Sequence, residues 1–204
     1  IQVGEPLNIN TIENDDLLGD KLTAFAPNTI GVKYNTKGQF GRPKCTEIIK
    51  QLYDCAFLTK HYSNLERVSF IYEQLANLQI KYDKNKDMSI RDCLLDTIRT
   101  CELILSEGCG NKNNYKLLMD GASNFNYYKI NGSINAFDMQ SYAFSVDIIA
   151  SKIFRKLYPS TKFEDKYDYQ IRTGINLKEL TLIADKDQIN EFYSYCLIPW
   201  NKKC

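Results

Sequence analysis

Three charged residues on two predicted helices have the types and spacing that phosphate chemistry needs. The first, Lys21, lies inside an apolar stripe of Leu18, Leu22 and Phe25, which follow the spacing of one helix face. A lysine in such a stripe must extend its ammonium group out of the apolar face or meet an anion. We interpret it as a compact positive charge that binds a phosphate. The alternative, which the pattern alone favours, is a surface lysine or one paired with Asp15 or another carboxylate.

The other two charged residues, Lys50 and Asp54, are four positions apart and share one face of a predicted helix. The opposite, core-facing side of this helix consists of Cys45, Ile48, Ile49, Leu52, Cys55 and Ala56. A solvated pair with lysine first contributes only about 0.3 kcal/mol, yet the pattern alone favours this interpretation. In the functional interpretation Lys50 faces a triphosphate, and Asp54 orients this triphosphate or a water on a bound metal.

Other side chains with catalytic potential have a simpler explanation. His61 follows Asp54 by seven positions and is a candidate general base, but a histidine at a helix C-terminus also favours the helix dipole. Asp15 and Asp16 are candidate metal ligands that also suit the first turn of a helix. No glycine-rich phosphate-binding fingerprint occurs. A hydrolase using His61 and Asp54 has no evident nucleophile and is the least favoured function.

The elements that position these residues are helices for most of the chain. Alternating apolar and polar residues predict a single strand over residues 3–11. Thr11 is the predicted N-cap of the first helix, and residues 27–43 form a long loop after it. Helical periodicity predicts helices over residues 11–25, 43–60, 63–82, 88–107, 113–130, 133–158, 176–184 and 186–196. The predicted fold is therefore mainly α, a helical bundle with one N-terminal strand.

Composition indicates a soluble cytoplasmic protein. Lys plus Arg (26) nearly balance Asp plus Glu (25), so the total charge draws the chain to neither nucleic acid nor membrane. Seven cysteines without a C-x-x-C spacing, together with a single histidine, argue against zinc and fit a reducing compartment. No apolar run is long enough to span a membrane, and no signal peptide is visible. Because the sequence starts at Ile1, we expect a piece of a longer protein.

The segment TIENDDLLGDKLTAFAPNTIGV…GRPKCTEIIKQLYDCAFL, residues 11–58, resembles the later motifs of the AbiEii/AbiGii toxin-type nucleotidyltransferases. These are bacterial proteins of abortive-infection and toxin–antitoxin systems. In that family a strand leads into a helix with an E/D-K-L-x-A-L-like sequence, which DKLTAF at 20–25 matches. A later helix carries an R/K-D/Q-x-x-D-L-like sequence, which KQLYDCA at 50–56 matches. The order of the motifs, their spacing and the intervening loop agree.

The resemblance implies that Lys21 and Lys50 bind nucleotide phosphates and that Asp54 is a catalytic residue. It also implies an NTP donor and Mg²⁺, which the family binds through an earlier Gly-Ser turn and a D-x-D pair on strands. Neither precedes the matching motifs here, and the acidic pair of that spacing, Asp185 and Asp187, lies far downstream. We therefore expect Mg²⁺ to be bound by residues outside this chain, and the chain alone to be inactive.

The resemblance further predicts two domains. Residues 1–60 form the C-terminal part of an α/β nucleotidyltransferase core, of which the strand is a remnant, and residues 61–204 form a helical bundle domain. The predicted function is the C-terminal fragment of a Mg²⁺-dependent enzyme that transfers a nucleotide from NTP to an acceptor such as RNA. The alternative is a non-catalytic helical interaction module that binds a cognate antitoxin protein or RNA.

Overall fold

The computed structural model describes residues 11–34, 44–82, 87–128, 132–160 and 182–195. Its helices are α1 (Asn14–Ala24), α2 (Cys45–Leu58), α3 (Leu65–Tyr82), α4 (Ile90–Leu105), α5 (Lys112–Phe125), the 3₁₀ turn η1 (Asn126–Tyr128), α6 (Ala136–Leu157) and α9 (Lys186–Tyr195). The described chain is mainly helical and has no strand, which confirms the helical bundle. The strand predicted at 3–11 lies outside the described residues except for Thr11, which belongs to no helix or strand.

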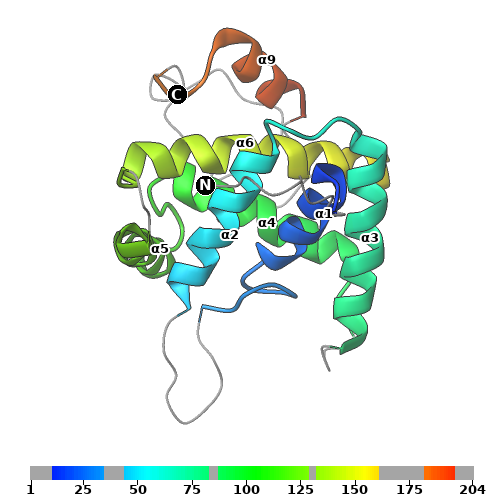
Figure 1. Ribbon diagram of the computed structural model, residues 1–204, viewed down its shortest axis with the longest axis horizontal. Helices are drawn as coiled ribbons and strands as arrows, with labels where there is room; N and C mark the ends of the chain where they lie inside the picture. Colours follow the sequence, from blue (N-terminus) through cyan, green and yellow to red (C-terminus); the bar gives the residue numbers. More distant parts are fainter. Residues whose placement is uncertain (1–10, 35–43, 83–86, 129–131, 161–181, 196–204) are drawn as a thin grey trace, which may run out of the picture.

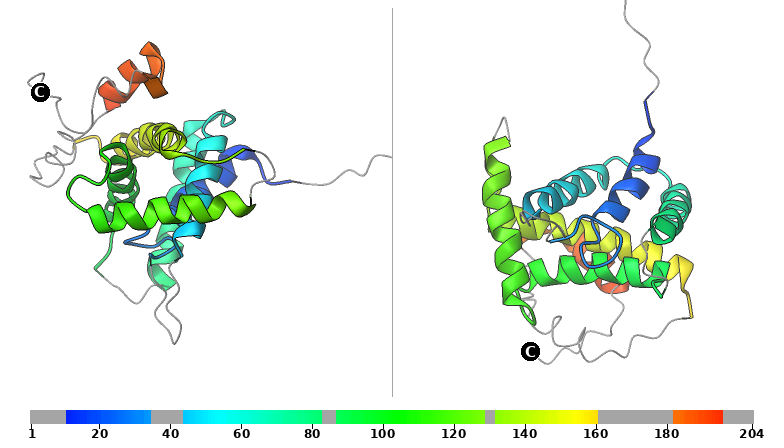
Figure 2. Two further views of the ribbon diagram at one scale, coloured as in Figure 1. Left: turned by 90° about the vertical axis from the view of Figure 1, so that its left-hand side faces the viewer. Right: turned by 90° about the horizontal axis from the view of Figure 1, so that it is seen from below.

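Helix α6 runs through the middle of the molecule (Figure 1). Helix α4 packs along one side of it, and α9 lies on the opposite side (Figures 1 and 2). Helix α1 packs between α2 and α3, and α2 also contacts α5 and α6. The two helices that carry the candidate site residues, α1 and α2, are therefore neighbours held from several sides.

Local sequence explains where α4 and α6, two largely buried helices, begin. The Ser89 hydroxyl accepts from the backbone N–H of Asp92, whose carboxylate accepts from the backbone of Ser89, so α4 starts with a capping box. Asn135 and Asp138 form the same arrangement at the start of α6. Helix α1 lacks such a cap. Its N-cap is Glu13 with no side-chain hydrogen bond, so the cap predicted at Thr11 is wrong.

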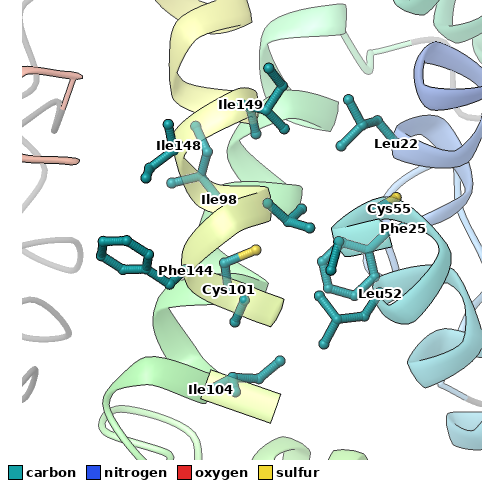
Figure 3. Close-up of a cluster of buried hydrophobic side chains, with 14 of the residues drawn as sticks. Leu22, Phe25, Leu52, Cys55, Ile98, Cys101, Ile104, Phe144, Ile148 and Ile149 are labelled. Carbon is teal, nitrogen blue, oxygen red and sulfur yellow. The ribbon is translucent and has the colours of Figure 1, made fainter. Parts of the chain in front are cut away.

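One hydrophobic core joins α1, α2, α4 and α6. Leu22, Leu52, Ile98 and Ile149 come from these four helices and point into the same space (Figure 3). Burying one such side chain stabilises the fold by about 1.5–3 kcal/mol. Helices on both sides of residue 60 contribute to this core, while the predicted division into two domains stays a prediction. Within the described ranges, no helix combines the length and apolar character that crossing a membrane requires.

Candidate functional site

Two of the three predicted site residues meet across the α1–α2 interface. The Nζ atom of Lys21 on α1 lies 3.3 Å from Oδ2 of Asp54 on α2. Both side chains are at the protein surface, with relative exposures of 24% and 27%. The apolar neighbours of Lys21 in sequence, Leu18 and Leu22, are fully buried, so the lysine lies at the edge of the core-facing stripe. Its partner is Asp54 and not Asp15, so the lysine is paired with another carboxylate, which the alternative interpretation also allowed.

The register of the two helices follows from a second contact. The Nδ2 atom of Asn14, at the start of α1, donates to the backbone carbonyl of His61, just beyond the end of α2, at 3.4 Å. Together with the Lys21–Asp54 pair, this hydrogen bond shows that α1 and α2 run antiparallel. A surface strip between the helices therefore begins at the ion pair and ends at Asn14 and His61. We call it the α1–α2 strip.

The third predicted residue, Lys50, is exposed on α2 one turn before Asp54. Its spacing from Asp54 places both residues on one helix face, as the sequence predicted. The ion pair that Asp54 makes within the described structure is nevertheless with Lys21. Asp20 is exposed beside Lys21. The charges of Asp54, Lys21 and Asp20 interact electrostatically with the thiol of Cys55. Burial raises the pKa of Cys55, which is therefore a protonated core residue.

The paired carboxylates at the start of α1 bind protein groups. Asp15 accepts hydrogen bonds from the backbone N–H and the hydroxyl of Ser63, at 2.8 and 3.0 Å. Asp16 accepts two hydrogen bonds from the guanidinium group of Arg67, and this pairing lowers the pKa of Asp16. The two contacts attach α1 to Ser63, just before α3, and to Arg67 in the first turn of α3. These interactions account for the two carboxylates without a metal ion.

The ring of His61 packs against the ring of Phe57 in a tilted arrangement. Their ring centroids are 4.6 Å apart with an interplanar angle of 45°. Phe57 lies one turn after Asp54 on α2 and keeps 56% of its surface exposed despite this contact. The sequence pattern indicated His61 as a candidate base but did not indicate Phe57. Its i, i+3 spacing from Asp54 was the available signal.

A polar cavity of about 340 Å³ lies elsewhere, between α4, the start of α5 and the loop after α1. Its most buried charged group is Asp96, which accepts hydrogen bonds from the backbone and side chains of Asn28 and Thr29. Burial raises the pKa of Asp96, and these hydrogen bonds act in the opposite direction. Because the carboxylate is occupied by the loop, we assign it a structural role.

Metal-binding features are absent from the part of the chain that the structure describes, where no three histidine, cysteine or acidic side chains gather as ligands. A Gly-Ser pair does occur at Gly132–Ser133, but it precedes α6 and follows both matching motifs. Comparison with models of protein families, with curated proteins and with solved structures finds no match. The fold and the α1–α2 site therefore define the protein only as a mainly helical bundle.

Proposed function

We propose that this chain is the C-terminal part of a nucleotidyltransferase of the AbiEii/AbiGii toxin type. In this proposal Lys21 binds the phosphates of an NTP donor, and Asp54 completes the site beside it. The observation that supports the proposal is the 3.3 Å pair between them. The two motifs were matched separately, from residues far apart in sequence, and the fold brings their charged members together.

The small contribution of this pair to stability means that Lys21 can exchange its anionic partner at little cost. A partly exposed ion pair contributes only about 0–1 kcal/mol to stability, because solvent screens it and both side chains lose conformational freedom. Lys21 is nevertheless held at the surface, where an incoming triphosphate can replace Asp54 as its anionic partner. Lys50, exposed one turn along α2, adds a second positive charge on the same face. In the proposal Asp54, beside both lysines, completes the part of the site that holds the donor.

The proposed reaction uses Mg²⁺, which neutralises the triphosphate when bound. The described residues do not fit a magnesium site, since they hold no group of three potential ligands. The proposal therefore assigns the metal-binding carboxylates to residues outside this chain, and gives this chain the task of holding the donor. An RNA acceptor, a cognate antitoxin protein and a cytoplasmic location belong to the same proposal. The free, buried Cys55 and Cys101 fit a reducing compartment.

The test is transfer of a labelled nucleotide by the complete gene product that contains this chain, with Mg²⁺ and each NTP. We expect Lys21→Ala and Asp54→Ala each to lower the transfer rate by about 100-fold, the scale of losing one stabilising group at a reacting phosphate. Their free energies of unfolding should change by less than about 1 kcal/mol. Loss of transfer without loss of stability separates a functional pair from a structural one.

A matched control comes from another surface lysine. Lys156 on α6 forms an ion pair with Glu66 and is exposed to a similar degree, 31%. Lys156→Ala should leave transfer unchanged. Undiminished transfer by both the Lys21 and Asp54 variants would show that these two residues are not part of the nucleotide site. If the wild-type protein transfers no nucleotide but binds RNA or an antitoxin without NTP and Mg²⁺, the interaction module is the better explanation.

A further inference from the structure

We infer that Phe57 is the stacking platform for the nucleobase of the nucleotide whose phosphates Lys21 binds. This inference rests on the proposed function and deepens it, because it assigns the part of the site that recognises the base. It starts from the α1–α2 strip, which has the Lys21–Asp54 pair at one end. The aromatic pair of Phe57 and His61 extends along α2 toward the other end.

The position of Phe57 follows from helix geometry. It comes three residues after Asp54, which corresponds to about 4.5 Å along the helix axis and to the same face. His61 lies a further four residues along. Because α1 and α2 are antiparallel, the direction from Lys21 to Asn14 on α1 is the same as the direction from Asp54 to His61 along α2. A nucleotide bound through its phosphates at the ion pair can therefore extend its ribose and base over Phe57.

The neighbouring residue on α1 fits this direction. Leu17 precedes Lys21 by one helical turn and is partly buried against the core. The antiparallel register places Leu17 at the same level of the strip as Phe57. The strip thus changes from charged to apolar over one turn. This is the order in which a nucleotide presents its phosphates and its base.

The ring of Phe57 is also available for stacking. His61 covers part of it, yet 56% of the residue stays exposed. A phenylalanine exposed to this extent contributes little to the core. An aromatic ring stacks on every base, because each base has a π-face. If Phe57 stacks on the base, the affinity for a nucleotide should depend on the presence of a base more than on which base it is.

The experiment compares nucleotides with a ligand that has only the phosphates. The complete gene product is titrated by calorimetry with ATP, GTP, CTP, UTP and inorganic tripolyphosphate. We expect Phe57→Leu to raise the Kd for the nucleotides by about 5- to 100-fold, the range that base–aromatic stacking spans. The Kd for tripolyphosphate should stay within about twofold. Phe57→Trp should preserve or strengthen nucleotide binding, since it keeps an aromatic face.

Phe70 on α3 provides the matched control, because it is exposed to nearly the same extent, 52%. Phe70→Leu should leave every Kd unchanged. Unchanged nucleotide affinity in Phe57→Leu overturns the inference and leaves the proposed function, which rests on Lys21 and Asp54, unaffected. A Lys21→Ala variant with unchanged tripolyphosphate affinity overturns the proposed function instead. If Phe57→Leu weakens a single-stranded RNA oligonucleotide but no NTP, the platform belongs to the acceptor and the inference is wrong.

Discussion

At the scale of single residues, one buried carboxylate attaches the loop after α1 to α4. Asp96 is 5% exposed and accepts hydrogen bonds from the backbone N–H groups of Asn28 and Thr29, at 2.7 and 2.8 Å. The Asn28 amide and the Thr29 hydroxyl also donate to it. These four donors come from a segment with no helix or strand of its own. Asp96 therefore helps to fix the loop that leaves α1, together with backbone hydrogen bonds within the loop, such as the one from Gly31 N–H to the Ala26 carbonyl.

We expect Asp96→Ala to lower the free energy of unfolding by about 3 kcal/mol, because four donors lose their acceptor in a largely buried position. Urea unfolding followed by circular dichroism measures this change as a lower midpoint. Asp120→Ala serves as the control, since Asp120 is an exposed aspartate on α5 and its loss should change stability by less than about 0.5 kcal/mol. A midpoint equal to that of the control would show that the loop is held by other contacts.

The residues of the candidate site were predictable in type but not in partnership. Motif spacing on each helix identified Lys21, Lys50 and Asp54, and the i, i+4 rule placed Lys50 and Asp54 on one face. The pairing of Lys21 with Asp54 depends on how α1 packs against α2, which no local pattern contains. The interactions of Arg67 with Asp16 and of Asp96 with the loop were missed for the same reason.

At the scale of elements, α2 and α5 approach each other closely where α5 has a glycine. A Cβ atom added at Gly121 would lie 2.6 Å from the backbone carbon and oxygen of Cys45. Glycine in a helix interior is less favourable than alanine by about 1 kcal/mol. The contact between the helices therefore outweighs the intrinsic preference of this position.

We expect Gly121→Ala to destabilise the fold by about 1–3 kcal/mol, because the methyl group meets backbone atoms and the helices must separate. Thermal unfolding measures the effect. Ser123→Ala, at an exposed position on the same helix, controls for helix propensity and should be neutral or slightly stabilising. If Gly121→Ala is as stable as the control, α2 and α5 are not in close contact at Gly121.

Periodicity predicted the helices well and their ends less well. Helix α5 stops at Phe125, whereas the sequence predicted a helix to residue 130. The side chain of Asn126 donates to the carbonyl of Ile134 and accepts from its backbone N–H, so the chain changes to the 3₁₀ turn η1 there. Asn126 and Ile134 are eight residues apart and Ile134 belongs to no helix, so helical periodicity could not predict this contact. The predicted helix over 176–184 lies mostly outside the described residues.

At the scale of the whole molecule, the shared core determines how the protein should unfold. Leu18 on α1 is fully buried, as are Tyr72 on α3 and Ile153 on α6. All three belong to one cluster that extends across residue 60, where the resemblance placed a domain boundary. Helices that bury one another's apolar faces lose much of their stability when separated. The described helices should consequently unfold together.

We expect a single calorimetric transition, with equal midpoints by near- and far-ultraviolet circular dichroism. Leu18→Ala tests the coupling, because it removes a buried side chain from α1 at a cost of about 2–5 kcal/mol. The whole transition should move down by about 2–4 °C for each kcal/mol. Leu78→Ala on α3, where the leucine is 44% exposed, should move it far less. Two separate domains would behave differently, because Leu18→Ala would then shift an early transition of α1 and α2 and leave a later one, from α4 and α6, in place.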